Sequence, residues 1–352
     1  MKILIIGPSW VGDMVMSQSL YITLKKLYPS AVIDVMAPAW CKPILERMPE
    51  VNQALDMPFQ HGEFKLFERI QVGQSLKTTK YNHAFILPNS AKSALIPFFA
   101  NIPKRTGWKG EMRYGLLNDL RLHKKSFQYM IERYIALAFT KEKMHNSSSL
   151  GEFDGLPKPV LLVNKDKQLN IIERFNIQKD MPILGFCPGA EFGVSKQWPK
   201  QYFADVANEM VKKGYQVCLF GSLKDKETTD KIRSLIDKDK QEKIHNLAGN
   251  TTLTEVIDLL AACEVVVSND TGLMHVAAAV RCKIVAVYGS SSPKYTPPLT
   301  DAVEIVHTDI ACRPCFKKDC EFSHMKCMTE IKPSLVIQSI RKLTAISLSN
   351  GL

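Results

Sequence analysis

The sequence predicts an α/β protein made of two doubly wound, Rossmann-like parallel-sheet domains. Short apolar runs suited to buried strands alternate along the chain with stretches of helical periodicity, and strands separated by helices form parallel sheets. Loops of glycine and small polar residues follow several of these runs, as expected where a parallel strand enters a helix. A chain of 352 residues can form two cores, and we place the two domains at residues 1–165 and 166–352.

The first domain begins with a strand at Lys2–Ile6, followed by a helix that runs from Met14 and stops before Pro29. The same alternation predicts further strands at 31–36 and 83–87 and helices at 40–48 and 64–76.

The loop after the first strand contains Gly7, Gly12 and Asp13. It lacks the Gly-Lys-Ser/Thr ending of a P-loop and the three-glycine dinucleotide fingerprint. A carboxylate at the carboxyl end of a strand can face a bound acceptor, and it can equally be the N-cap of the next helix. Both roles stay open for Asp13 on local grounds.

Two later stretches of this domain carry positive charge. Residues 88–94 open a helix with small polar residues and a lysine, and residues 104–125 mix cations with aromatic residues and three glycines, which predict a loop. This basic cluster can hold a phosphorylated sugar, bind RNA by stacking, or form a solvated surface. The candidate binding residues are Asn89, Lys92, Arg105 and Arg113.

A polar segment at 140–159, broken by serines, glycines and prolines, is interpreted as an interdomain connection or a surface loop. Strand and helix alternation resumes at 183–187. The loop that follows contains Gly189, Ala190, Glu191 and Lys196 and leads to a helix started by a proline. Glycines allow backbone to approach a diphosphate and a lysine supplies a mobile positive charge, so this loop is a candidate phosphate site.

A strand at 215–220 is followed by Asp225 and Glu227. A carboxylate soon after such a strand commonly binds a ribose hydroxyl pair, and a charged helix start explains both residues equally well.

The stretch from Val265 to His275 changes character within four residues. Its β-branched start predicts a buried parallel strand at 265–267. The next four residues, 268–271, all suit a helix N-cap, Gly272 permits close backbone approach, and a helix follows at 273–280. A helix N-terminus at the end of a strand favours a phosphate.

The rest of the second domain is predicted to hold a helix at 253–262, a strand at 283–288 with a small-residue turn after it, and a closing helix at 333–348. Cys312, Cys315, Cys320 and Cys327 form a dense cluster together with His324. Such density can hold Zn²⁺ or an iron–sulfur cluster, but the spacing fits no standard pattern well, and reduced, packed thiols or a redox-labile loop explain it too.

The net charge of +11 predicts an anionic partner, such as nucleic acid, an anionic membrane surface or a phosphorylated substrate. Nine cysteines, an odd number, without a secretory signal, indicate reduced thiols in the cytoplasm. The apolar run at the N-terminus is too short for a signal peptide or a membrane span.

Several separated segments together resemble the ADP-heptose:lipopolysaccharide heptosyltransferases, a glycosyltransferase family. They are residues 6–13, 34–41, 87–90, 105–108, 110–119, 185–193 and 269–275. The resemblance implies a GT-B architecture, with two Rossmann-like domains facing a cleft, the acceptor bound mostly by the first domain and the nucleotide-sugar donor by the second. It also implies inverting transfer from ADP-heptose onto the first heptose of the lipopolysaccharide inner core, Hep-Kdo2-lipid A, without metal or other cofactor, at the cytoplasmic face of the inner membrane.

The resemblance also implies roles for single residues. Asp13 stands at the position of the proposed general base, and Lys196 stands where the family binds the donor diphosphate. The donor-binding residues we assign are Gly189, Ala190, Glu191, Asp225, Asp270, Thr271, Gly272 and His275, and the acceptor-binding residues are Trp10, Gly12, Asn89, Lys92, Arg105 and Arg113.

Two details refine these assignments. Related enzymes that add the first heptose carry paired threonines where this chain has Ala190 and Glu191, so backbone donors must do more of the phosphate binding. The charge of Asp270 is unfavourable beside a diphosphate, so we expect it to contact heptose hydroxyls or to cap the helix, leaving Thr271 and Gly272 nearest the phosphates.

Three alternatives remain. Transfer onto Kdo would make the chain the enzyme of the preceding step. A nucleotide-sugar epimerase of the same fold would need no acceptor, and an RNA-binding protein would explain the charge through phosphate contacts, although glycine loops at three strand ends disfavour it.

Overall fold

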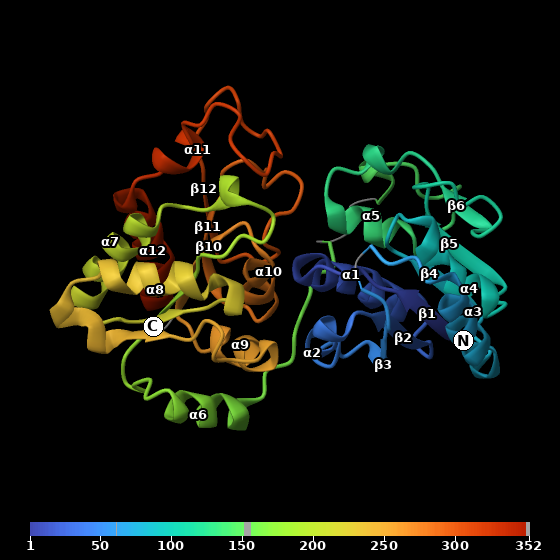
Figure 1. The fold of residues 1–352 in the computed structure, drawn as a ribbon, viewed down its shortest axis with the longest axis horizontal. Coiled ribbons are helices and arrows are strands. Elements are labelled where there is room, and N and C mark those ends of the chain that lie inside the picture. The colour runs from blue at the N-terminus through green and yellow to red at the C-terminus, as the bar shows by residue number, and fades with distance from the viewer. Residues whose placement is uncertain (61, 151–155, 350–352) are drawn as a thin grey trace. The chain divides into compact units, whose positions relative to one another are not determined.

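The computed structural model describes residues 1–60, 62–150 and 156–349 and divides into two compact units. Unit 1 comprises Met1–Val160 together with Lys294–Thr296, and unit 2 comprises Leu161–Pro293 together with Pro297–Leu352. The first 160 residues run from blue to green in Figure 1. The return of Lys294–Thr296 to unit 1 has no signal in the sequence: the Tyr295 carbonyl accepts a hydrogen bond from the Met130 N–H at 3.0 Å.

Unit 1 contains a six-stranded, entirely parallel sheet in the order β3-β2-β1-β4-β5-β6. Its strands are β1 (Lys2–Ile6), β2 (Val32–Ala37), β3 (Val51–Asp56), β4 (His83–Ile86), β5 (Lys104–Trp108) and β6 (Asp119–Arg121). Its helices are α1 (Val11–Leu27), α2 (Lys42–Leu45), α3 (Leu66–Ser75), α4 (Leu95–Phe99) and α5 (Met130–Ala136), with short 3-10 helices η1 (Ala39–Cys41), η2 (Leu76–Thr79), η3 (Ala91–Ala94), η4 (Lys124–Ser126) and η5 (Ser147–Leu150).

Unit 2 repeats this plan with the order β9-β8-β7-β10-β11-β12, again entirely parallel. Its strands are β7 (Ile183–Cys187), β8 (Gln216–Leu219), β9 (Ile244–Asn246), β10 (Val265–Asn269), β11 (Lys283–Val287) and β12 (Val303–Val306). Its helices are α6 (Lys165–Arg174), α7 (Lys200–Lys212), α8 (Lys226–Leu235), α9 (Leu253–Leu260), α10 (Gly272–Ala279), α11 (Lys326–Thr329) and α12 (Pro333–Ser349), with 3-10 helices η6 (Val194–Lys196), η7 (Leu223–Asp225) and η8 (Lys238–Lys243).

The central strands are buried along their length, as parallel strands covered on both faces must be. All five residues of β7 and of β10 are buried, as are four of the five in β1. In unit 2 an aromatic cluster packs beneath the sheet, with the Trp198 and Phe203 ring centroids 4.9 Å apart and those of Phe186 and Phe203 5.2 Å apart. The predicted fold class is confirmed.

Several expectations about local structure are wrong. Residues 104–125 were expected to form a loop, but they contain β5 and β6. Gly107, which favoured the loop interpretation, lies inside β5 because the neighbouring strand comes very close: a Cβ there would stand 2.9 Å from the Ile86 carbonyl oxygen. Strands β3, β9 and β12 and helices α6 and α11 were not predicted either, since short or polar elements have weak periodicity.

Helix α1 starts at Val11, earlier than the expected Met14, with Trp10 as its N-cap. The N-cap interpretation of Asp13 is therefore wrong: Asp13 lies inside the first turn, where a carboxylate also interacts favourably with the helix dipole. The segment expected to form a loop at 140–159 includes η5, and its residues 151–155 lie outside the described part of the chain.

Candidate active site

In both sheets the chain adds its first three strands toward one edge and its last three strands toward the other edge. The order of strands therefore switches between the two central strands. In this arrangement ligands bind beside the carboxyl ends of those two strands. In unit 1 they are β1 and β4, and in unit 2 they are β7 and β10. We call these places the unit 1 switch point and the unit 2 switch point.

At the unit 1 switch point the chain leaves β1, passes Gly7 and enters α1, which carries Asp13. The Tyr134 hydroxyl of α5 donates to the Asp13 carboxylate at 3.4 Å. Burial raises the pKa of Tyr134 well above its usual value, with the charge of Asp13 as a further cause, so its hydroxyl keeps its proton. Asp13 is half-buried, and its carboxylate is thus held by a neutral donor.

The two tryptophans of this region are exposed. Trp10, next to the start of α1, is 55% exposed, and Trp40 in η1 is 50% exposed. The Trp40 indole N–H donates to the Ser9 carbonyl at 2.9 Å, which fixes the loop after β2 against the loop after β1. Gly12 is buried within the first turn of α1. The Trp10 side chain is therefore accessible to a ligand, whereas Gly12 is packed inside unit 1.

The loop after β4 carries Asn89 and Lys92 and is locked to the loop after β5. The Asn89 carbonyl accepts from the Glu111 N–H at 3.0 Å, and the Glu111 carboxylate accepts from the Ala91 N–H at 2.8 Å. A Cβ at Gly110 would stand 2.1 Å from the Asn89 carbonyl oxygen, so only glycine fits there. These contacts bring residues of the stretch 88–94 together with residues of the basic stretch 104–125.

The two arginines predicted to bind acceptor are occupied by the protein's own backbone. The Arg113 guanidinium is buried and donates to the carbonyls of Trp108 and Pro88, and burial lowers its pKa to about 10. Arg105 donates to the Leu116 carbonyl at 2.7 Å and to the Ile102 carbonyl at 2.6 Å. Both arginines hold the loop after β5 in place, and their assignment to acceptor binding stays a prediction.

At the unit 2 switch point the loop after β7 places Lys196 beside Asp270, which follows β10. The Lys196 ammonium donates to the Asp270 carboxylate at 2.5 Å, and the two side chains are 16% and 5% exposed. The ammonium also lies 5.0 Å from the centre of the Phe192 ring. If one member of a buried ion pair is removed, the remaining charge is buried without a partner, which destabilises the fold.

Asn269, the last residue of β10, ties the two loops together. Its side-chain amide donates to the Pro188 carbonyl at 2.7 Å and accepts from the Trp198 N–H at 3.2 Å. The sequence suggested Asn269 only as one of four helix caps, and no local pattern could show that it spans the loop of a different strand. By fixing both ends of residues 188–198, Asn269 helps to place Lys196.

Helix α10 starts at Gly272 with Thr271 as its N-cap, although the Thr271 side chain makes no capping hydrogen bond. The alternative that Asp270 caps this helix is therefore wrong, and its carboxylate is paired with Lys196 instead. His275 is buried one turn into the helix; burial lowers its pKa to about 4, with opposite smaller effects of Asp270 and Lys196. His275 is accordingly neutral near pH 7.

The carboxylates suggested for a ribose differ in their surroundings. Asp225 accepts from the Ser222 N–H and hydroxyl, each at 2.8 Å, and stands against the loop after β7: a Cβ at Gly189 would lie 2.6 Å from its Oδ1. Glu227 is exposed on α8. Glu191 pairs with Lys224 at 2.7 Å on the surface, and Ala190 is buried. The structure thus brings Asp225, and not Glu227, to Gly189.

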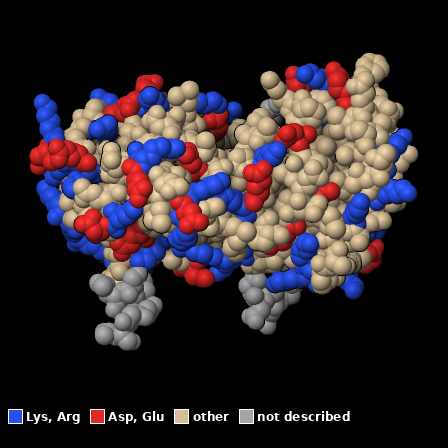
Figure 2. Space-filling model, turned by 90° about the horizontal axis from the view of Figure 1, so that it is seen from below, with Lys and Arg blue, Asp and Glu red and all other residues tan. Residues whose placement is uncertain are grey.

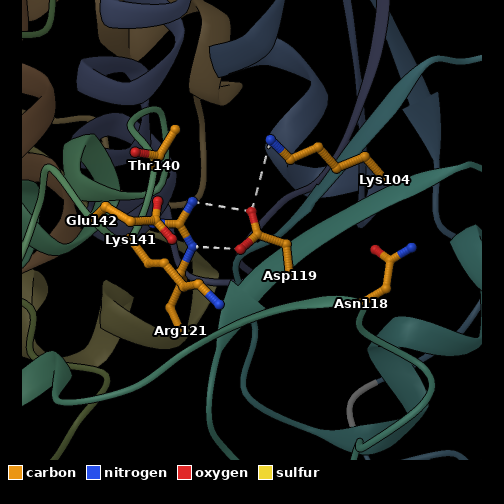
Figure 3. Close-up of a pocket in the computed structure, with 7 residues that line it drawn as sticks. All are labelled: Lys104, Asn118, Asp119, Arg121, Thr140, Lys141 and Glu142. Atoms are coloured by element: carbon orange, nitrogen blue, oxygen red, sulfur yellow. Dashed lines mark hydrogen bonds and ion pairs between the residues drawn. The ribbon is translucent and has the colours of Figure 1, made fainter.

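A hollow of about 370 Å³ in unit 1 lies elsewhere, at the amino ends of β5 and β6 (Figure 3). Inside it Arg121 binds the Asp119 carboxylate at 2.8 Å, and Lys104 lies 3.9 Å from the same group. The Thr106 hydroxyl also donates to Asp119 at 2.8 Å. The Asp119 carboxylate is thus already paired, and no residue predicted to act in the site lines this hollow, so we place the site at the switch points.

The family model for glycosyltransferase family 9 (heptosyltransferase) matches residues 69–326. The lipopolysaccharide heptosyltransferase 2 of Salmonella typhimurium is 49% identical over 97% of this chain and 98% of its own length. The lipooligosaccharide heptosyltransferase 2 of Haemophilus influenzae is 47% identical over 98% and 100%. Among solved structures, the ADP-heptose lps heptosyltransferase II of E. coli superposes with a TM-score of 0.90, at 46% identity, over 99% of this chain and all of that one.

Proposed function

The chain belongs to glycosyltransferase family 9 (heptosyltransferase), and we propose that it transfers heptose from ADP-heptose onto the first heptose of the lipopolysaccharide inner core, Hep-Kdo2-lipid A. One observation carries this proposal: the 49% identity to a lipopolysaccharide heptosyltransferase 2 spans nearly the whole of both chains. Unit 2 binds the donor and unit 1 the acceptor in this proposal.

Donor binding rests on the unit 2 switch point. The N–H groups at the start of α10, around Thr271 and Gly272, provide a positive dipole end for the diphosphate. Among the residues that we assign to donor binding, Lys196 is the one with a formal positive charge. Its ion pair with Asp270 holds the ammonium in place before the donor binds. In this proposal Asp225, which lies beside Gly189, accepts from the ribose hydroxyls.

Acceptor activation rests on Asp13. The acceptor hydroxyl oxygen bonds to the anomeric carbon, the bond from that carbon to the ADP oxygen breaks with its electron pair leaving on ADP, and Asp13 takes the hydroxyl proton. A carboxylate suffices as base because the proton is lost late in an oxocarbenium-like step, so correct placement matters more than basicity. The Tyr134 hydroxyl supports that placement.

Charge that develops on the departing diphosphate is met by Lys196 and by the N–H groups of α10. Neither a metal ion nor another cofactor is required for these steps, because the protein supplies each cation and donor that they use.

We also propose that the protein works at the anionic inner face of the inner membrane, where its acceptor is anchored. The net charge of +11 favours such a surface. On the face drawn in Figure 2, Lys and Arg side chains are interspersed with Asp and Glu and do not form one continuous basic stripe of the kind that tracks nucleic acid. Within the described residues, every helix is too short or too polar to cross a bilayer.

The deciding experiment measures ADP release from ADP-heptose with two acceptors, Kdo2-lipid A with and without its first heptose. We expect release only with the heptose-bearing acceptor. Equal or preferred use of the acceptor without heptose would reassign the chain to the preceding transfer. Consumption of ADP-heptose with no acceptor present would favour the epimerase alternative.

A further inference from the structure

Four of the nine cysteines surround one small hollow in unit 2. Cys312, Cys315, Cys320 and Cys327 all line an enclosed space of about 20 Å³, which is room for one small atom or ion and its contacts. We call these residues the cysteine cluster. They come from sixteen consecutive positions of the chain, and they are free thiols.

The other five cysteines have a different setting. Cys41, Cys187, Cys218, Cys263 and Cys282 are buried at scattered places in both units. Within the cysteine cluster, by contrast, Cys327 is buried, Cys315 is exposed and Cys312 and Cys320 are half-buried. Free cysteines are ordinarily buried as small apolar residues, so packing does not explain the three members of the cluster that reach solvent.

The segment that carries the cluster has little regular structure to hold it. Between β12 and α11 the chain has no described helix or strand, and Phe316, Ser323 and Met325 have positive φ angles of 55°, 56° and 48°. These are strained conformations for residues other than glycine. A segment so shaped needs a cross-link or a strong local contact to stay in place.

A positive charge lies beside the thiols, and the thiolate is the form of cysteine that binds a metal. Arg313, which also lines the hollow, brings a positive charge that would offset an anionic metal–thiolate centre.

We propose that the cysteine cluster binds one thiophilic divalent metal ion, Zn²⁺ in the first instance, through four thiolates. Zn²⁺ prefers a tetrahedral set of four sulfur ligands in structural sites. Binding releases the four thiol protons and leaves a centre of net charge −2. As the side chains of the described residues stand, no three Cys, His, Asp or Glu groups are placed where they could hold a metal ion, so binding requires the four thiols to turn into the hollow by side-chain rotation.

This site is structural and separate from the transfer chemistry. The same segment holds the loop that carries Lys196: the Ser195 N–H donates to the Lys318 carbonyl at 3.1 Å and the Ser195 hydroxyl donates to the Lys317 carbonyl at 2.5 Å. The Phe316 N–H donates to the Ser290 carbonyl at 2.8 Å, which ties the segment to the loop after β11. The metal would therefore brace the backbone next to Lys196 without touching substrate.

The test uses the full-length protein, reduced, freed of metal with a chelator, and then loaded with Zn²⁺ or Co²⁺ and desalted. We expect about one Zn²⁺ per chain by elemental analysis, and with Co²⁺ a sulfur-to-cobalt charge-transfer absorption of the kind that four thiolates give. Cys312→Ser and Cys320→Ser should each lower retained metal at least about tenfold. Neither measurement depends on catalytic activity.

Cys218→Ala is the matched control, since Cys218 is a thiol of unit 2 buried in β8, away from the hollow. It should retain metal like the wild type. If wild-type protein keeps no Zn²⁺ after desalting and shows no charge-transfer absorption with Co²⁺, the proposal fails. The proposal is also overturned if freshly purified, metal-free protein contains a Cys312–Cys315 disulfide and, after that disulfide is reduced, the protein still binds no Zn²⁺.

Discussion

The two sheets share one strand order but handle charge differently at their switch points. In unit 1 the carboxylate of Asp13 is half-buried and meets a neutral hydroxyl, that of Tyr134. In unit 2 the carboxylate of Asp270 is almost fully buried and meets the ammonium of Lys196. The same scaffold thus sets a hydroxyl against one carboxylate and an ammonium against the other.

This difference fits two different tasks. A base must keep its carboxylate able to take a proton, and a neutral hydrogen-bond donor can orient it without supplying a full opposite charge. A phosphate ligand must have its cation in place, and a buried partner charge can hold it there. Function therefore lies in the loops after the strands and not in the sheets.

The largest effect should come from removing Asp13, the proposed base in unit 1. We expect Asp13→Asn to lower kcat about 10³- to 10⁴-fold, because the amide keeps the shape but accepts no proton, while ADP affinity stays near that of the wild type. The readouts are initial-rate ADP release and ADP binding by calorimetry. Asp166→Asn, which changes an exposed carboxylate in the first turn of α6, should behave like the wild type, and an equally active Asp13→Asn enzyme would leave Asp13 with a purely structural role.

Next in size is the ion pair of unit 2. Lys196→Ala should lower kcat/KM about 10²-fold and lower the free energy of unfolding by about 3–5 kcal/mol, since it leaves Asp270 buried without its cation. Denaturant unfolding and steady-state kinetics measure both. Lys224→Ala breaks the Lys224–Glu191 pair, whose side chains are 77% and 52% exposed, and should leave the free energy of unfolding nearly unchanged because solvent screens an exposed pair.

A double-mutant cycle with Asp270→Asn sharpens this result. We expect the stability loss of Lys196→Ala and Asp270→Asn together to be clearly smaller than the sum of the single losses, because the pair is coupled. Additive losses would mean that the two side chains act independently.

Acid should weaken both units through one histidine each, which is buried in unit 2 and half-buried in unit 1. Burial lowers the pKa of His275 in unit 2 to about 4 and that of His83 in unit 1 to about 3. Because the unfolded chain binds the proton near pH 6.5 and the folded chain does not, stability is full above pH 6.5 and is lost as the pH falls toward 4 and 3. At about 1.4 kcal/mol per pKa unit, the upper limit of this loss is about 3 kcal/mol for His275 and about 5 kcal/mol for His83.

Thermal unfolding midpoints measured from pH 7 to pH 4 test the point. His275→Asn should show a smaller fall of Tm over this range than the wild type, and the remaining fall should shrink again when His83→Asn is added. A slope unchanged in both variants would place the acid sensitivity in other groups.

The smallest effect should come from the neutral partner in unit 1. Tyr134→Phe removes the hydroxyl that contacts Asp13 at 3.4 Å, a long hydrogen bond, and should lower kcat only about two- to fivefold with little change in donor KM, a loss of under about 1 kcal/mol. Tyr81→Phe removes a similar hydroxyl-to-carboxylate hydrogen bond, to Asp34 at 2.7 Å, and should reduce stability without changing kcat. If both variants lower kcat alike, Tyr134 has no special link to the base.

Local patterns in the sequence were sufficient for much of the fold. β-branched apolar runs such as the start of β10 predicted the central strands, and glycine and small polar residues marked the loops after them. The family could be predicted because several contiguous, distinctive segments carry the resemblance, and Asp13, Lys196 and Asp270 remain predicted site residues. Short strands were not predicted. Strand β5 contains Gly107 and β6 has only three residues, so neither shows an alternation of apolar and polar residues that could identify it as a strand.

What the side chains do at those positions was decided only by the tertiary structure. The sequence marked Arg105 and Arg113 as cations for a ligand, but both donate to backbone carbonyls of their own unit. Asp270 was expected at the sugar or at the helix cap, and it pairs with Lys196, 74 positions away along the chain. Such partners meet because the strand order places the ends of β7 and β10 side by side, and strand order is a property of the whole packed sheet that no local pattern encodes.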